Sequence, residues 1–286
     1  MNKVSEDGSV AFPAGIAVTS EANDQSNIEI IRGDNKVLIA WEDFANGIDF
    51  NITGQIIDAN SMELIGDNIA ICHEDLYQGS PTLAYDGDGR FIVAWEDERG
   101  VDNGDPALSG GLDVYVQIVT EEGLQYQAGG VTVASEYHDQ SLPQFQHLYF
   151  NDYGDPVWML YWIDMRSSGK EDLKNLYAQG IEIVESGIED DLVPTEFKVS
   201  AAYPNPFNGA VALDVEISEV GPVIFSITNI LGQMVYQQTL LPTRAGKFQI
   251  MWNGRDQIQK GLPSGIYFYS VNTNVNIVSG KFTYLK

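Results

Sequence analysis

Three kinds of feature are scarce in this chain of 286 residues, and each scarcity excludes a class of protein. The single cysteine, Cys72, cannot form an intramolecular disulfide, so oxidative cross-links take no part in the fold. Basic residues are few, and 15 Lys and Arg against 41 Asp and Glu give a formal net charge of −26. Such a surface repels phosphate backbones and anionic lipid. No apolar run approaches the length of a membrane-spanning helix. We therefore expect neither nucleic-acid binding nor membrane insertion.

The residues that are present predict two folded domains. A hydrophobic share of 44% and an aromatic share of 11% are ample for packed cores. Residues 1–194 hold 8 Lys and Arg against 36 Asp and Glu, whereas residues 195–286 hold 7 against 5. Two surfaces that differ so much predict separate domains at 1–190 and 195–286. The acidic stretch 187–194, which ends in a proline, is typical of a linker.

The first domain shows one set of sequence landmarks three times, at about 13–66, 67–128 and 129–187. Each repeat has a glutamine-led segment, a strand that ends in tryptophan and an acid, and a closing glutamine. The tryptophans and acids are Trp41 and Asp43, Trp95 and Asp97, and Trp162 and Asp164. The closing glutamines, Gln55, Gln117 and Gln179, lie 62 residues apart each time. We interpret all nine residues as repeat scaffold.

Short β-branched and aromatic runs, four to a repeat, predict an antiparallel sheet in each. The Asp-Gly pairs at 86–89 predict a tight hairpin turn between the middle two runs. Four strands in about 60 residues match a propeller blade better than an α-repeat. The predicted fold is therefore all-β, with three four-stranded propeller-like repeats followed by an immunoglobulin-like β-sandwich.

The repeat pattern resembles tandem repeats of secreted bacterial propeller proteins, which read Gln-x-x-Pro, Ala-Trp-x-Asp-x-Arg and Asp-x-Tyr-x-Gln. The first repeat departs from the pattern, because Asn27 replaces the proline and Ala45 stands where the second repeat has Arg99. Closed propellers have about four to eight blades, and the segment 1–7 lacks the apolar core of a signal peptide. These features favour a trimmed or mature fragment, or copies that associate through their repeat edges.

From Val199 onward, strands recur at intervals of 8–12 residues with Gly and Pro between them, which predicts a small β-sandwich. Its motifs are Tyr-Pro-Asn-Pro-Phe at 203–207, Leu-Gly-Gln at 231–233, Trp-Asn-Gly-Arg-Asp at 252–256, Ser-Gly-Ile-Tyr at 264–267 and a last strand that ends in Lys. As a set they resemble the type A C-terminal sorting domain of type IX secretion cargo. They are also similar to the immunoglobulin-like domain of flagellar hook-capping proteins.

The resemblance implies a destination. Such domains are read by the outer-membrane translocon, and many are then removed or exchanged for a surface anchor. We therefore expect a secreted or cell-surface protein with the type IX translocon as partner. The residues implied to carry the signal are Tyr203, Pro204, Asn205, Pro206, Phe207, Gly232, Gly265, Tyr267, Lys281 and Lys286. Gly265 is also expected to let the chain turn sharply after Ser264.

The sequence predicts no catalytic site. The histidines at 73, 138 and 147 are too scattered for a zinc cluster, and Cys72 has no activating base nearby in the pattern. The acids at 42–43, 96–98 and 164 recur at one position of each repeat. We expect them to accept hydrogen bonds from turn backbone or to pair with Arg99 and Arg166, rather than to act as glycosidase carboxylates.

The tryptophans, which repeat in the same way, are expected to pack between blades. An oxygen-rich loop is the candidate calcium site, although it lacks the spacing of an EF-hand. Its residues are Asp102, Asp105 and Asp113. No other cofactor is expected.

These observations predict a non-catalytic adhesion or structural protein with an unidentified surface ligand. Two alternatives remain open. The chain is the C-terminal fragment of a secreted hydrolase whose catalytic part lies upstream, or it is a self-assembling surface or filament subunit.

Overall fold

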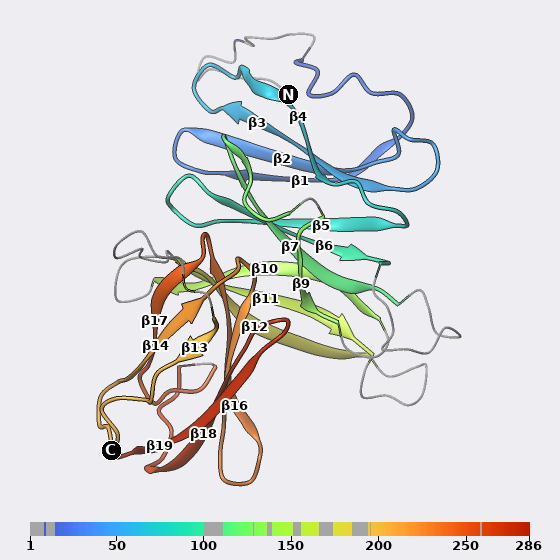
Figure 1. The fold of residues 1–286 in the computed structure, drawn as a ribbon. Helices are drawn as coiled ribbons and strands as arrows, with labels where there is room; N and C mark the ends of the chain where they lie inside the picture. The colour runs from blue at the N-terminus through green and yellow to red at the C-terminus, as the bar shows by residue number, and fades with distance from the viewer. Residues whose placement is uncertain are drawn as a thin grey trace. The chain divides into compact units, whose positions relative to one another are not determined.

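The computed structural model of this chain describes residues 9, 15–99, 111–127, 129–135, 139–150, 156–165, 174–184, 194, 196–257 and 259–286. Within these residues the regular structure consists of strands, and the all-β prediction is confirmed (Figure 1). The same residues contain no helix long and apolar enough to cross a membrane.

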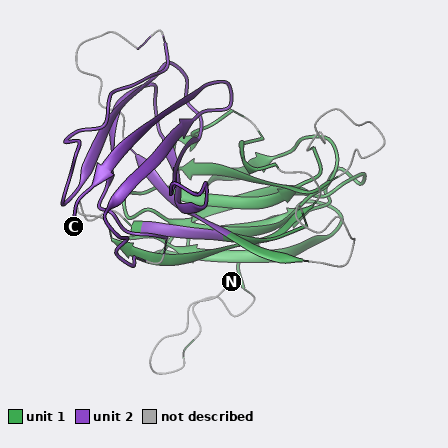
Figure 2. Ribbon diagram, turned by 90° about the horizontal axis from the view of Figure 1, so that it is seen from below, with its two compact units in different colours: residues 1–156, 161–177 green, residues 157–160, 178–286 purple. Residues whose placement is uncertain are grey.

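The chain divides into two compact units (Figure 2). The first comprises residues 1–156 and 161–177, and the second comprises residues 157–160 and 178–286. The domain boundary predicted between 190 and 195 lies mostly outside the described residues and stays a prediction.

The first repeat is a four-stranded antiparallel sheet in chain order. Its strands are β1 (Gln25–Arg32), β2 (Lys36–Asp43), β3 (Asn51–Asp58) and β4 (Leu64–Cys72). Alternate residues of β2 face opposite sides of the sheet, as the twofold repeat of a strand requires. Leu38 and Ala40 join one apolar cluster, and Ile39 and Trp41 join another. This sheet is therefore apolar on both faces.

The second repeat has the same first three strands and a divided fourth edge. Its strands are β5 (Gln78–Tyr85), β6 (Phe91–Asp97), β7 (Asp113–Thr120), β8 (Gly123–Leu124) and β9 (Val131–Ala134). Both β8 and β9 pair with β7. The hairpin predicted at 86–89 is present, because Gly87 and Gly89 have φ of 89° and 79° and the Asp86 amide donates to the Arg90 carbonyl at 3.1 Å.

The third repeat supplies β10 (Gln140–Phe150), β11 (Pro156–Asp164) and β12 (Asn175–Val184). The edge of β12 that does not face β11 pairs in parallel with β16 (Met234–Pro242). The paired residues run from Gly180 opposite Gln238 to Val184 opposite Pro242. All of these paired residues belong to the second unit. A strand from the C-terminal part of the chain therefore lies where the first repeat has its own fourth strand.

The sheets of the repeats stack face to face within the first unit. The first strand of the second repeat, β5, packs on β1, β2 and β3, and β10 packs on β5, β6 and β7. Figure 1 shows these strands as successive layers. Each new repeat therefore lays its first strand on the face of the repeat before it.

The second unit also contains two sheets that share an aromatic core. One sheet has the order β13-β14-β17, and the other continues from β12 in the order β16-β15-β18-β19. The remaining strands are β13 (Lys198–Val199), β14 (Val211–Ile217), β15 (Val223–Thr228), β17 (Gly246–Trp252), β18 (Gly265–Asn272) and β19 (Ile277–Tyr284). Every second residue of β17 is buried, which is the pattern of a strand with one face on a core. Side chains from both sheets form one buried cluster, as in a β-sandwich.

Candidate functional site

The opening motif of the sandwich lies along the C-terminal strand β19. Asn205 makes two hydrogen bonds to one edge of it: its Nδ2 donates to the Lys281 carbonyl at 3.2 Å, and its Oδ1 accepts from the Thr283 amide at 2.9 Å. The Phe207 amide then donates to the Thr283 carbonyl at 3.0 Å, and the Leu285 amide donates to the Phe207 carbonyl at 2.7 Å. The peptide bonds before Pro204 and Pro206 are both cis. Two predicted signal segments, 78 residues apart, therefore form one structural element.

Phe207 anchors this element in the core. Its side chain is 2% exposed, and its ring centroid lies 4.9 Å from that of Tyr284, 5.5 Å from Phe282 and 5.8 Å from Trp252. Gly254 has a φ of +74°, and a Cβ on it would lie 2.6 Å from the Tyr284 ring. The glycine of the Trp-Asn-Gly motif is therefore required both by its backbone conformation and by the close approach of Tyr284.

Tyr203, the first residue of the opening motif, belongs to a polar cluster with side chains of β14 and β17. Its hydroxyl donates to the Asp214 carboxylate, with both oxygens at 2.9 Å, and accepts from Nε2 of Gln249 at 2.9 Å. The hydrogen bond to Asp214 raises the pKa of Tyr203 above its usual value. Asp214 and Gln249 are cross-strand neighbours on β14 and β17, and the motif alone did not indicate them. Their polar identity within alternating strands was the available signal.

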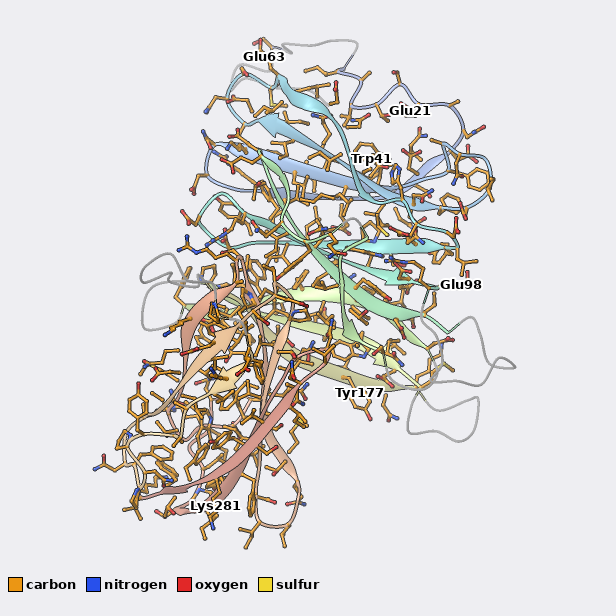
Figure 3. All side chains as sticks on the ribbon, viewed as in Figure 1. Glu21, Trp41, Glu63, Glu98, Tyr177 and Lys281 are labelled. Carbon is orange, nitrogen blue, oxygen red and sulfur yellow. The ribbon has the colours of Figure 1, made fainter. Side chains whose placement is uncertain are left out.

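The remaining signal residues lie on turns and on the last strand pair. Gly232 has a φ of +77° in the Leu-Gly-Gln turn, whose Leu231 is 77% exposed. Tyr267 is buried and donates its hydroxyl to the Pro263 carbonyl at 2.8 Å. Lys281, labelled in Figure 3, and Lys286 are exposed, and the Lys286 amide donates to Oγ of Ser264 at 2.8 Å.

Gly265 does not act as the sequence suggested. It begins β18, pairs with Tyr284 and does not have a left-handed φ. A Cβ built on it would meet only Tyr267 Cε2, at 4.0 Å. The chain does bend at Ser264, directly before β18, but Gly265 itself lies in the strand and makes no left-handed turn.

In the second repeat, the motif acid Asp97 is the centre of a buried hydrogen-bond network. Its carboxylate accepts from Nε1 of Trp95 at 2.8 Å, from the Arg99 amide at 3.0 Å, and from the Arg99 guanidinium at 2.6 and 2.8 Å. The same guanidinium donates to the Gly129 carbonyl at 2.8 Å and lies 4.5 Å from the Tyr115 ring centroid. The network therefore joins three separated segments of the repeat around one carboxylate.

The other two repeats keep part of this network. Trp162 donates to Asp164 at 3.0 Å, as Trp95 does to Asp97. In the first repeat Asp43 accepts from the Ala45 amide at 3.0 Å and from Nε2 of Gln25 at 3.2 Å. Nε1 of Trp41 is buried and has no hydrogen-bond partner among the residues that the structure describes (Figure 3). Arg166 lies outside those residues.

The closing glutamines bind the fourth edge of each repeat. Gln55 donates to the Ile65 carbonyl at 3.0 Å, and Gln117 accepts from the Tyr126 amide at 2.9 Å. Oε1 of Gln179 accepts from Nε2 of Gln237, on β16, at 3.2 Å. The third glutamine therefore meets a strand of the C-terminal sandwich at the position where the others meet their own repeat. The scaffold role of the nine repeat residues stays a prediction, and these contacts support it.

Cys72 is fully buried between the first two repeats, with Arg99 Nη2 at 3.4 Å from its sulfur. Burial raises the pKa of the Cys72 thiol to about 12. The reactive species of cysteine is the thiolate. We therefore expect the native protein to resist alkylation at neutral pH and to react fully after unfolding, as measured by thiol titration with and without denaturant. Stoichiometric labelling of the folded chain would contradict the buried position.

The described residues offer no group of three or more His, Cys, Asp or Glu side chains that could hold a metal ion. Of the calcium candidates, Asp102 and Asp105 lie outside the part of the chain that is described. Asp113 begins β7, is buried, and pairs with Asp97 across the sheet. His73 contacts Oγ1 of Thr53 at 2.8 Å, and burial lowers its pKa.

Comparison with known proteins identifies the C-terminal part of the chain. Residues 201–284 match the family model described as a secretion system C-terminal sorting domain. This match covers the elements that carry the Asn205, Phe207 and Tyr203 contacts. No curated protein matches the chain.

Similarity to solved structures is weak. An α-L-arabinofuranosidase from Lactobacillus brevis is 13% identical with a TM-score of 0.36, over 58% of this chain and 55% of that one. PorU from Porphyromonas gingivalis is 11% identical with a TM-score of 0.27, over 87% of this chain and 26% of that one. PorZ, a type IX secretion component of the same organism, is 12% identical with a TM-score of 0.26, over 94% and 39%. The chain spans about half the length of the arabinofuranosidase. Scores this low assign neither fold nor activity.

Proposed function

We propose that this chain, whose residues 201–284 are a type IX secretion sorting domain, is a non-catalytic adhesion or structural protein. Its repeats are proposed to be the binding or assembly module. The sorting domain makes the chain a cargo of the type IX secretion system, destined for the cell surface or the extracellular space. The proposal concerns what the repeats do after export. One observation carries it: most acids of the repeat motif are buried and accept hydrogen bonds from other parts of the protein.

Of the acids that could resemble a glycosidase pair, Glu98 is half-buried and the others are in the interior. Glu42, Asp43, Glu96, Asp97 and Asp164 are between 0% and 5% exposed. Burial raises the pKa of Glu96, as a general acid requires, but its Oε1 accepts a hydrogen bond from the Leu142 amide of the next repeat. A carboxylate held between two stacked sheets cannot reach a glycosidic oxygen. This favours a scaffold role over catalysis.

The sorting signal is proposed to be the folded surface built from the opening motif and β19. Because Asn205 and Phe207 hold β19 in place, the structural residues and the signal residues are largely the same. The exposed groups of that surface are available to a receptor. Tyr203 is 44% exposed and Leu285 is 49% exposed, and Lys281 and Lys286 lie beside them on or after β19.

Hydrolysis assays of the purified full chain test the non-catalytic assignment. We expect no release of product from chromogenic glycosides, an arabinofuranoside among them, or from plant and bacterial polysaccharides. The matched variant is Glu96→Gln, which keeps the shape and the acceptor oxygen of the side chain. If the parent protein hydrolyses a substrate and the Glu96→Gln variant does not, the repeats are enzymatic and the proposal is wrong.

A further inference from the structure

The stacked repeats are joined by a contact that recurs at both internal junctions. Oε1 of Glu42, in the first repeat, accepts a hydrogen bond from the Ser80 amide of the second at 2.7 Å. Oε1 of Glu96, in the second repeat, accepts from the Leu142 amide of the third. In both junctions the glutamate follows the strand tryptophan, and the amide belongs to the second residue after a buried glutamine.

The donor residues share a special backbone conformation. Ser80 and Leu142 have φ of 49° and 53°, in the left-handed region that residues other than glycine seldom adopt. In β5 the residue lies in a β-bulge, where the register shifts between Gly79 and Thr82. A bulge leaves its extra residue unpaired in the ladder. The strained residue therefore turns its amide out of the sheet toward the glutamate of the preceding repeat.

The first repeat has the same bulge and left-handed residue, but no described residue supplies the matching glutamate. Asn27, two residues after Gln25, has a φ of 46° and lies in a bulge between Ser26 and Glu29. No carboxylate in the described part of the chain accepts from its amide, and its side chain donates to Glu42 at 2.7 Å. Such backbone strain persists only where the surroundings impose it. The first repeat thus presents the same backbone amide as the other two, without a matching glutamate in the described part of the chain.

The apolar residues on the same face repeat this contrast. Leu83 is 8% exposed and packs in one cluster with Leu38 of the first repeat. By strand register, Ile30 occupies the position of Leu83, since Ile30 pairs with Ile39 as Leu83 pairs with Val93. Ile30 is 60% exposed and its neighbour Ile28 is 65% exposed. Val18 packs against the adjoining part of this face, on Ile39 and Trp41.

We propose that the face of the first repeat formed by Asn27, Ile28 and Ile30, beside the part that Val18 covers, is a docking surface for one further four-stranded repeat of the same kind. Its glutamate, following a strand tryptophan, would accept from the Asn27 amide, and its apolar face would cover Ile28 and Ile30. A second copy of this chain cannot supply that contact. Glu42 and Glu96 are already engaged, and the third repeat has Ile163 at the corresponding position.

An extended chain tests the docking surface. A second copy of residues 25–77, inserted directly before Gln25, places the added Glu42 opposite the native Asn27. We expect the native Asn27 amide to exchange its hydrogen at least ten-fold more slowly than in the parent protein. Changing Glu42→Ala in the added copy alone should remove most of that protection. If the added repeat leaves exchange at Asn27 unchanged in a folded chain, the proposal is wrong.

The exposure of Ile30 gives a second test of the docking surface. Ile30→Lys should leave the melting temperature of the parent unchanged and lower that of the extended chain, because only there is Ile30 covered. The control is Ile48→Lys, at a loop residue that is 81% exposed, which should have no effect in either chain.

In the unextended protein, the Asn27 amide should exchange at least ten-fold faster than the Ser80 amide. Equal protection would overturn the proposal even if the extended chain failed to fold. Protection that rises with protein concentration would point instead to a second copy on this face. None of these outcomes depends on export or on catalysis.

Discussion

Replacing Asp97 with alanine is expected to lower the free energy of unfolding by about 3–5 kcal/mol, the loss that follows when one partner of a buried ion pair is removed. Asp97 is fully buried and receives hydrogen bonds from Trp95 and from both the amide and the guanidinium of Arg99. Without it, the guanidinium loses its charged partner, and the indole N–H is buried with no acceptor. Chemical denaturation of the full chain, followed by tryptophan fluorescence, measures the change.

The first repeat provides the matched control. Asp43 occupies the same position, but among the described residues it accepts from Gln25 and the Ala45 amide, and no arginine follows it. Asp43→Ala should therefore cost about 1–3 kcal/mol, the range for leaving buried donors unsatisfied. If the two variants lose the same stability, the arginine contact adds nothing, and the acid alone accounts for the effect.

The sequence was sufficient where local chemistry determines structure. The Asp-Gly hairpin and the strands that carry the motif tryptophans follow from turn propensity and from short β-branched and aromatic runs. The hydrogen bond from Trp95 to Asp97 was also within reach, because residues two apart on a strand share a face. The prediction that Asp97 would pair with Arg99 followed from their opposite charges in the motif, and the structure has this pair.

The sequence was insufficient where distant segments meet. Nothing in the pattern of β12 indicated that its edge pairs in parallel with β16, which lies more than 50 residues later in the chain. The left-handed residues were equally hidden, because Asn27, Ser80 and Leu142 share no side-chain chemistry. Ser80 and Leu142 each donate to the glutamate of the preceding repeat, and a single sequence does not show that tertiary contact.

Ending the chain after Gly280 is expected to abolish its arrival at the cell surface. The truncation removes Phe282 and Tyr284, which are 1% and 7% exposed, and half of the pairing between β18 and β19. Loss of a buried aromatic side chain alone costs about 3–5 kcal/mol. It also removes the strand to which Asn205 and Phe207 bind. Cell fractionation and surface protease accessibility, in a bacterium with a type IX system, should find the truncated protein in the periplasm.

Two further variants separate the fold of the domain from its C-terminal residues. Phe207→Ala destabilises the same core and leaves the C-terminus intact, whereas the double change Lys281→Ala and Lys286→Ala removes two exposed charges and keeps every strand pair. If the translocon reads the folded surface, Phe207→Ala should be held back and the double lysine variant should be exported. Retention of the lysine variant alone would mean that these charges are read directly. Normal arrival of the truncated chain would show that residues 281–286 are not needed for sorting, which would contradict a signal that depends on the intact β19 surface.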